Sequence, residues 1–345
     1  MGMHAGGVIA FPSWPRGWEE VAEVVTGFPG PRRMSWSDAP ESVRRAVSDS
    51  LGSPIVSVQT PQGGFTPGVS ARLVLADGRR CFVKATSASC GEWALAAYRH
   101  EASVNNHLPT AVPAPRMWTY IDDGEWICLI FDDAAGRFPS PSWDGDDLPR
   151  VLDALDLSAR ALTPNPTPIA ATVRDAFSAV LGGSWQRLHD NPALADADPW
   201  AAEHLTDLIA KEQRWTDGVD GTTLLHLDLR RDNILLTPTE VLFVDWAWPA
   251  VGAAWLDLVC FLPTVAAQTA RYDVDAVFRS RPAGRTAPAE AVDAFLVALA
   301  GYWRSNSLLP TPSYAPLLRR EQQRAADGAT RWLRTRAQTW AADAR

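Results

Sequence analysis

The sequence predicts an α+β protein with two lobes, a five-stranded antiparallel sheet with one inserted helix and then a larger, mainly helical lobe. Between residues 55 and 131, short apolar stretches are separated by turn residues, as in a series of short strands. Beyond residue 147, apolar residues recur at helical spacing in most segments. With 345 residues, the chain is long enough to bury the cores that two lobes require.

Five strands and one helix are expected in the first lobe. Asp77-Gly78, between the second and third strands, is a strong hairpin signal, and Pro109 ends the helix. A turn at Asp123-Gly124 joins the last two strands. The expected strands cover residues 55–60, 69–76, 80–86, 116–122 and 125–131, and the helix covers residues 92–108.

The chain divides into three predicted parts: an N-terminal helical extension (1–50), the sheet lobe (51–133) and the helical lobe (134–345). In the extension, Asp38 is the expected N-cap of a short helix, with Glu41 as its capping-box partner. The expected helices of the last part cover residues 147–162, 169–181, 199–215, 254–266, 288–305 and 313–340.

The composition is that of an ordinary globular protein, with 46% apolar and 21% charged residues. No apolar run approaches the ~18 residues of a membrane span, and no basic segment precedes the first apolar stretch as in a secretory signal. The cysteines form no C-x-x-C pair, which favours reduced thiols. We therefore expect a cytoplasmic protein that does not interact with membranes.

The net charge of −8 argues against nucleic acid as a partner, because phosphate backbones bind basic surfaces. It is compatible with a cationic small-molecule substrate, although many acidic proteins bind no cation. No heptad run predicts a coiled coil, so a monomer is expected.

The most informative segment covers residues 224–248. It sets His226, Asp228 and Asn233 at the spacing H-x-D-x-x-x-x-N, and an apolar strand that ends at Asp245 follows. Kinase-type phosphoryl transfer uses a carboxylate beside the attacking hydroxyl, an amide on a metal ion and a second, metal-binding carboxylate. Polar groups between apolar strands are costly unless they bind something charged.

Four motifs, FVKA (82–85), GGFTPG (63–68), HLDLRRDN (226–233) and VDW (244–246), together resemble the aminoglycoside phosphotransferase family. This family is a branch of the protein-kinase-like enzymes that also includes choline kinases. The resemblance runs from about residue 56 to residue 260. It implies a bilobal protein-kinase-like fold and an O-phosphotransferase that uses ATP or GTP together with Mg²⁺.

The resemblance also implies roles for the motif residues. Asp228 matches the aspartate that accepts or orients the proton of the substrate hydroxyl, and Asn233 and Asp245 match the magnesium ligands. His226 matches a scaffold position that packs the loop. Taken singly, each Asp or Asn is also compatible with a turn or a helix cap.

Lys84 and Lys211 are the two lysines among 32 basic residues, which makes a lysine within an apolar strand notable. In the family, the matching lysine contacts the α and β phosphates and is held by a glutamate of the next helix. Glu92 and Glu101 both qualify, and Glu101 lies in the segment that looks like the family's. A snorkelling strand lysine and a solvated helix glutamate are the alternatives.

Gly63, Gly64 and Gly68 lie between the first two strands, where glycines let backbone N–H groups approach a polyphosphate. The loop matches neither G-x-G-x-x-G nor a Walker loop, and an ordinary hairpin loop is the alternative. In the connector between the lobes, Phe131–Asp133 are expected to meet the adenine through backbone atoms.

Arg230 stands two residues after Asp228, where protein kinases often carry a lysine. It would either steady the transferring phosphoryl group or form a salt bridge to Asp232, and both alternatives stay open. Asp257 matches an aspartate that is expected to brace the catalytic loop. Three tryptophans near the metal aspartate would line the substrate site or belong to the core: Trp246, Trp248 and Trp255.

The acceptor would be a hydroxyl of a small molecule. An aminoglycoside or another antibiotic is the first expectation, which would make the protein a resistance enzyme. A metabolic kinase for an amino alcohol or a sugar, and a non-catalytic nucleotide-binding scaffold, are the alternatives. Candidate acids for a polycationic acceptor, which a solvated face explains equally well, are Asp273, Asp275, Glu290 and Asp293.

Overall fold

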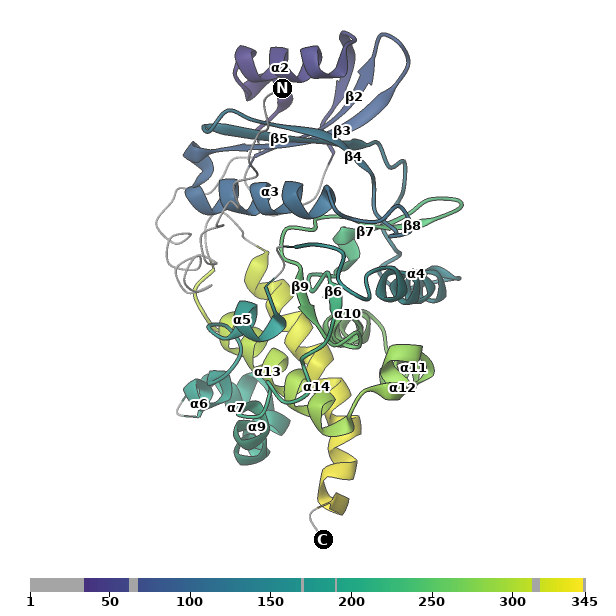
Figure 1. Cartoon of the computed structure of the whole chain (residues 1–345). Helices are drawn as coiled ribbons and strands as arrows, with labels where there is room; N and C mark the ends of the chain where they lie inside the picture. Colours follow the sequence, from purple (N-terminus) through teal and green to yellow (C-terminus); the bar gives the residue numbers. More distant parts are fainter. Residues whose placement is uncertain (1–33, 62–67, 169–170, 190, 312–316, 344–345) are drawn as a thin grey trace, which may run out of the picture.

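The computed structural model describes residues 34–61, 68–168, 171–189, 191–311 and 317–343. Within these residues, one antiparallel sheet has the strand order β1-β2-β3-β5-β4, and a larger, mainly helical lobe lies below it in Figure 1. The strands are β1 (Ile55–Gln59), β2 (Val69–Leu75), β3 (Arg80–Ser87), β4 (Met117–Asp122) and β5 (Trp126–Asp132). The five predicted strands are therefore confirmed, with ends that differ by at most one residue.

Two helices cover the two faces of the sheet, α2 (Glu41–Leu51) on one and α3 (Glu92–Asn105) on the other (Figure 1). Successive residues of β5 alternate between these faces, so that Ile130 packs in the α2 cluster and Leu129 in the α3 cluster. Because both faces are covered, β5 is an almost continuous apolar run. The same alternation in β3 places Lys84 on the α3 face.

The N-terminal extension packs as part of the sheet lobe where the structure describes it, because residues 36–51 share an apolar cluster with the sheet. Asp38 is not the N-cap of α2, so that prediction is wrong. It ends a short 3-10 helix, and its carboxylate accepts the N–H of Ser35 at 2.8 Å in a capping box of its own. Pro40 excludes helical geometry for Ala39 and so separates the two helices. We propose a lobe boundary near residue 34 in place of residue 50.

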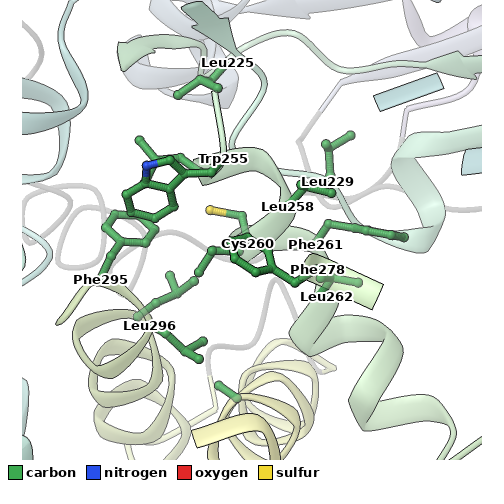
Figure 2. Packing of buried hydrophobic residues seen from close by; sticks show 14 of the residues in the cluster. Leu225, Leu229, Trp255, Leu258, Cys260, Phe261, Leu262, Phe278, Phe295 and Leu296 are labelled. Carbon is green, nitrogen blue, oxygen red and sulfur yellow. The ribbon is translucent and has the colours of Figure 1, made fainter. Parts of the chain in front are cut away.

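The helical lobe surrounds three helices that pack on one another, α10, α13 and α14 (Figure 1). Figure 2 shows part of its core, where Trp255 meets Phe295 edge to face at 5.9 Å between ring centroids. The helices are α4 (Asp147–Ala161), α5 (Val173–Phe177), α6 (Ser184–Leu188), α7 (Ala193–Ala197), α8 (Pro199–Glu203), α9 (Leu205–Glu212), α10 (Leu256–Gln268), α11 (Val274–Ser280), α12 (Pro282–Thr286), α13 (Ala289–Ser307) and α14 (Leu318–Asp343).

Two predicted helices differ from the structure. Residues 169 and 170 of the helix predicted for residues 169–181 lie outside the described residues, and the rest of that prediction is reduced to α5, whose start is capped by the Thr172 side chain. The helix predicted for residues 199–215 is divided at His204, whose ring Nδ1 bonds to the carbonyl of Trp200 at 2.9 Å. The helices α6, α7, α11 and α12 were not predicted.

Two small strand pairs frame the segment that carries the motif. They are β6 (Thr223–Leu225) with β9 (Ala250–Gly252), and β7 (Ile234–Leu236) with β8 (Val241–Phe243). The loop of residues 226–233 therefore connects β6 to β7, and Asp245 follows β8 closely. The hydrogen bond from His100 of α3 to the carbonyl of Ala247 and the ion pair of Lys84 with Asp245 place the segment after β8 at the junction of the two lobes.

None of the described helices is both long and apolar enough to cross a membrane. All four cysteines lie in the described part of the chain and are free, with Cys81, Cys128 and Cys260 buried and Cys90 partly buried.

Candidate functional site

The loop after β6 is held by a carboxylate of the helical lobe. Asp257, at the start of α10, accepts the backbone N–H of His226 at 3.0 Å and that of Leu227 at 2.8 Å. Leu227 has a φ of 63°, a left-handed conformation that a branched side chain rarely adopts. Two bonds to one buried carboxylate stabilise this strained turn, which confirms the prediction that Asp257 braces the loop.

His226 is part of the scaffold. Its Nε2 donates to the carbonyl of Val244 at 2.9 Å, and its Nδ1 accepts the N–H of Asp228 at 3.3 Å. This pair of bonds requires the neutral tautomer with the proton on Nε2. Burial lowers the pKa of His226, which favours that neutral form. The ring also packs against Trp246, with 4.7 Å between centroids.

Asn233 lies directly beside Asp228. Its amide nitrogen donates to the backbone carbonyl of Asp228 at 2.8 Å and to the carboxylate Oδ2 at 3.1 Å. Both bonds use the nitrogen, so the amide oxygen is the atom that faces away from Asp228 as a possible cation ligand. Burial raises the pKa of Asp228 to about 6, and the nearby Arg230 guanidinium opposes this rise.

Lys84 forms two ion pairs, one within the sheet lobe and one across to the helical lobe. Its Nζ lies 2.7 Å from Oε2 of Glu101 and 2.8 Å from Oδ1 of Asp245. Glu101 is 1% exposed, whereas Glu92 is exposed to solvent, so the structure pairs Lys84 with the glutamate that the sequence motif favoured. The ammonium group also lies 5.0 Å from the ring centroid of Tyr98.

The protonation of this cluster follows from burial and charge. Burial raises the pKa of Glu101 to about 7 even though Lys84 favours its ionised form. Burial acts in the same direction on Asp245, but the attraction of Lys84 outweighs it and holds the pKa of Asp245 below its usual value. The two carboxylates together raise the pKa of Lys84, which is therefore a cation at neutral pH.

A cavity of ≈ 180 Å³ lies between the lobes at this cluster. Its polar lining includes Lys84, Glu101, Asn233 and Asp245, and Asp228 borders it through Asn233. Apolar side chains from both lobes also line it, among them Phe82, Phe131, Phe138, Leu235 and Phe243. The cavity thus combines apolar side chains with charged groups, as ligand sites commonly do.

The connector after β5 is fixed by two arginines that the sequence analysis did not single out. Asp133 lies 3.2 Å from Nε of Arg72 and 2.9 Å from Nε of Arg80. Arg72 also donates to the carbonyl of Ala134 at 3.1 Å and lines the cavity. The sequence signal for this contact was an arginine in each of two predicted strands, Arg72 in β2 and Arg80 in β3. Only the pairing of the strands shows that both arginines reach Asp133. Phe131 is buried beside them.

Of the three predicted loop glycines, Gly63 and Gly64 lie outside the described residues. Gly68 has a φ of 142°, and a Cβ placed there would lie 2.3 Å from the carbonyl oxygen of Ala85. Close packing of β2 on β3 therefore requires glycine at this position, whatever the loop binds.

Arg230 contacts two carboxylates of the same loop. It donates to Oδ1 of Asp232 at 3.1 Å and to Oδ2 at 3.4 Å, and its Nη1 lies 3.6 Å from Oδ1 of Asp228. The salt bridge that the sequence left open is thus formed, and it holds the guanidinium beside the predicted catalytic aspartate.

The candidate acids for a polycationic acceptor have internal partners. Asp275 and Asp293 are buried and both pair with Arg336 of α14. Asp273 caps the start of α11, and Glu290 pairs with an arginine, Arg214, at 3.2 Å. These four residues therefore do not form a shared acidic surface for a polycation. The alternative explanation, a solvated surface, applies only to Asp273 and Glu290, because these two side chains are exposed.

The three tryptophans near Asp245 belong mainly to the core. Trp246 and Trp255 are 1% and 4% exposed, respectively, whereas Trp248 is partly buried. Trp246 also contributes to the lining of the cavity.

No family model and no curated protein matches the chain. Among solved structures, spectinomycin phosphotransferase in complex with ADP and spectinomycin is 10% identical, with a TM-score of 0.54 and coverage of 83% of this chain and 97% of that chain. A choline/ethanolamine kinase family protein from Mesorhizobium loti is 13% identical, with a TM-score of 0.53 and coverage of 86% and 94%. Choline kinase from Cryptosporidium parvum is 11% identical, with a TM-score of 0.51 and coverage of 94% and 97%.

These likenesses establish the fold. The chain has the bilobal protein-kinase-like fold of the small-molecule kinases, which confirms the fold class predicted from the sequence. The arrangement of its lobes around the cavity is the arrangement expected for that fold.

Proposed function

We propose that the protein is a kinase that transfers the γ-phosphoryl group of a nucleoside triphosphate to a hydroxyl of a small molecule. The observation that carries this proposal is the convergence of Lys84, Glu101, Asn233 and Asp245 on one cavity, with Asp228 bonded to Asn233 at its edge. These groups come from both lobes and from widely separated parts of the chain. Charged groups with shifted pKa values that face a cavity are typical of functional sites, although structural ion pairs also occur in cores.

In this proposal, Lys84 holds the α and β phosphates. Glu101 orients the lysine from α3, at 2.7 Å. Gly63, Gly64 and Gly68 would cover the phosphates with backbone N–H groups. The base would lie among the apolar side chains beside Phe131, near the connector backbone at Asp133. Both ATP and GTP are compatible with such a site.

The residues present fit a magnesium ion. Asp245 supplies a carboxylate whose Oδ1 pairs with Lys84, which leaves Oδ2 for a cation, and Asn233 supplies its amide oxygen. No group of three or more His, Cys, Asp or Glu side chains suited to a metal occurs among the described residues, so the protein donors would be few. Magnesium is commonly held in this way, by one or two protein oxygens, phosphate oxygens and water. Bound there, the ion would neutralise charge on the phosphates.

Asp228 would orient the acceptor hydroxyl and receive its proton. The transition state of phosphoryl transfer is loose, so positioning and charge supply most of the rate. Arg230, 3.6 Å from Asp228, would steady the transferring phosphoryl group while Asp232 holds its guanidinium.

The acceptor is a small molecule, and we favour an aminoglycoside or another antibiotic, as the fold of spectinomycin phosphotransferase suggests. An amino alcohol is the second candidate, because a choline kinase and a choline/ethanolamine kinase family protein share the fold. The internal pairing of the candidate acids removes their support for a polycation. We place the enzyme in the cytoplasm, where nucleotide, Mg²⁺ and a reducing environment for its four thiols are available. We propose that it acts as a monomer.

A direct test incubates the purified chain with Mg-ATP or Mg-GTP and a library of hydroxyl compounds that includes aminoglycosides, choline and sugars. We expect a product heavier by one phosphoryl group for at least one acceptor, and none with Asp228→Asn. Expression in a susceptible bacterium then separates the antibiotic acceptor from the metabolic one. A wild-type chain that binds neither nucleotide in the presence of Mg²⁺ would refute the proposal.

A further inference from the structure

The turn at residues 245–247 must hold a strained conformation. Asp245 has a φ of 69°, in the left-handed region that non-glycine residues rarely occupy. Such a conformation persists only where the surrounding contacts determine it. The carboxylate on this residue is the one that we assign to the metal, so the contacts that hold the turn also set the position of that carboxylate.

One set of contacts comes from the helical lobe. The carbonyl of Val244, just before the turn, accepts a hydrogen bond from Nε2 of His226 at 2.9 Å. The indole of Trp246 donates to the carbonyl of Phe243 at 3.1 Å, and its ring packs on His226. These contacts fix the first half of the turn to the catalytic loop.

The second set comes from the sheet lobe, through α3. The carbonyl of Ala247, at the end of the turn, bonds to Nδ1 of His100 at 2.9 Å across 147 positions of sequence. A carbonyl only accepts, so Nδ1 of His100 carries the proton. The next residue of α3, Glu101, pairs with Lys84 at 2.7 Å, and Lys84 in turn pairs with Asp245 at 2.8 Å. Two consecutive residues of α3 thus hold the turn, His100 directly and Glu101 through Lys84.

We propose that His100 is a positioning residue that fastens α3 to the metal turn and so keeps Asp245 and the Lys84–Glu101 pair in register across the lobes. This inference rests on the proposed function for its catalytic meaning. Two histidines, one from each lobe, then bracket Asp245: His226 binds the carbonyl before it and His100 the carbonyl of Ala247 after it. Loss of the His100 bond leaves the strained turn held firmly on one side, and the metal carboxylate then samples other positions.

The chain offers a matched control for this bond. His107, just beyond the end of α3, makes the same type of contact, from Nδ1 to the carbonyl of Ser103 at 2.8 Å, but within its own segment and at an exposed position. His107→Ala removes an equivalent hydrogen bond without touching the other lobe. Two further variants at position 100 test which ring nitrogen makes the bond. The amide nitrogen of Asn can reach the place of Nδ1, whereas that of Gln reaches the place of Nε2.

The experiment compares His100→Ala, His100→Asn, His100→Gln and His107→Ala in the full chain. Calorimetry gives the affinity for ATP with and without Mg²⁺, and amide hydrogen exchange of the ligand-free chain reports on residues 244–249 and on α3. For His100→Ala we expect Mg-ATP affinity to fall about three- to tenfold, the range for one lost hydrogen bond, with a smaller change for metal-free ATP. Exchange at the turn should become faster. His100→Asn should restore the Mg-ATP affinity and the slow exchange at the turn. His100→Gln should behave as His100→Ala does, and His107→Ala should behave as the wild type does.

Equal turn exchange in His100→Ala and wild type would overturn the inference. So would a restoration by Gln and not by Asn, because the bond from Nδ1 would then not be the cause. If His100→Ala does not fold, the comparison of the Asn and Gln variants decides alone. Failure of the proposed function has a different signature: the wild-type chain would bind no Mg-nucleotide, while the exchange difference between wild type and His100→Ala would remain.

Discussion

Lys84 of β3 and Asp245 of the turn after β8 lie 2.8 Å apart, from Nζ to Oδ1, across 161 positions of sequence. The pair crosses from the sheet lobe to the helical lobe, and Glu101 joins it from α3. Three charged groups are thus gathered at the edge of one cavity. Two carboxylates to one ammonium leave a net negative charge there, which a bound cation would balance.

Lys84→Met is expected to lower kcat/KM on the order of 10²-fold, the scale of removing one preorganised donor from a reacting group. The loss should appear in steady-state assays with the acceptor identified in the library screen. The matched control is Lys211→Met, because the other lysine lies over the Trp340 ring at 4.5 Å in the helical lobe. Equal losses in both variants would contradict a specific role for Lys84.

Asp228→Asn is expected to reduce the turnover number by about 10²–10⁴, the usual range for general acid–base catalysis. The amide keeps the shape of the side chain, so nucleotide affinity by calorimetry should stay close to wild type. Asp220→Asn, at an exposed ion pair with Arg174, provides the control for loss of a carboxylate. Retained turnover in Asp228→Asn would show that another group accepts the proton.

The pH dependence of kcat/KM follows from Asp228. Burial raises its pKa to about 6, so we expect the carboxylate to become protonated and kcat/KM to fall as the pH drops through about 6. Arg230 opposes this rise, and Arg230→Met should therefore move the acidic limb to higher pH. Arg231→Met is the control, since Arg231 donates to the carbonyl of Pro139 at 3.1 Å. An unchanged limb in Arg230→Met would exclude this coupling.

Asp257→Ala removes the acceptor of two backbone N–H groups, those of His226 and Leu227. Buried N–H groups without partners should lower the free energy of unfolding by about 3 kcal/mol. Urea unfolding measures this loss. Asp273→Ala, which removes the cap of α11, should cost about 1 kcal/mol and serves as the comparison. A smaller effect of Asp257→Ala than of Asp273→Ala would contradict the bracing role.

Gly68→Ala should destabilise the sheet lobe by about 2 kcal/mol or more, because its Cβ would lie 2.3 Å from the carbonyl oxygen of Ala85. Gly78→Ala separates the clash from backbone strain. Gly78 also has a positive φ, 85°, but no atom lies within 4 Å of the place that a Cβ would occupy. In thermal unfolding, the Tm of Gly68→Ala should be lower than that of Gly78→Ala. The reverse order would show that packing of residue 68 on β3 is not the constraint.

The strands and the motif were predictable because each rests on local spacing, and the choice of Glu101 rested on the resemblance of its segment to the family's. Period two in residues 80–87 places Lys84 on the face opposite to that of Val83, and the H-x-D-x-x-x-x-N spacing needs no more than eight residues. One prediction from local spacing, the N-cap at Asp38, was wrong because it ignored the effect of a neighbouring proline. Asp38 resembles an N-cap until the effect of Pro40 on Ala39 is considered.

The sequence by itself therefore determined the two-lobed fold and the identity of the polar groups at the site, because periodicity and motif spacing are properties of short segments. The tertiary structure decided which distant residues meet. It paired Asp275 and Asp293 with Arg336 in the helical core, and it brought His100 to the carbonyl of Ala247. No local pattern encodes such pairs. Each pair depends on how whole helices and strands pack, because packing decides which buried polar group lies within reach of which partner.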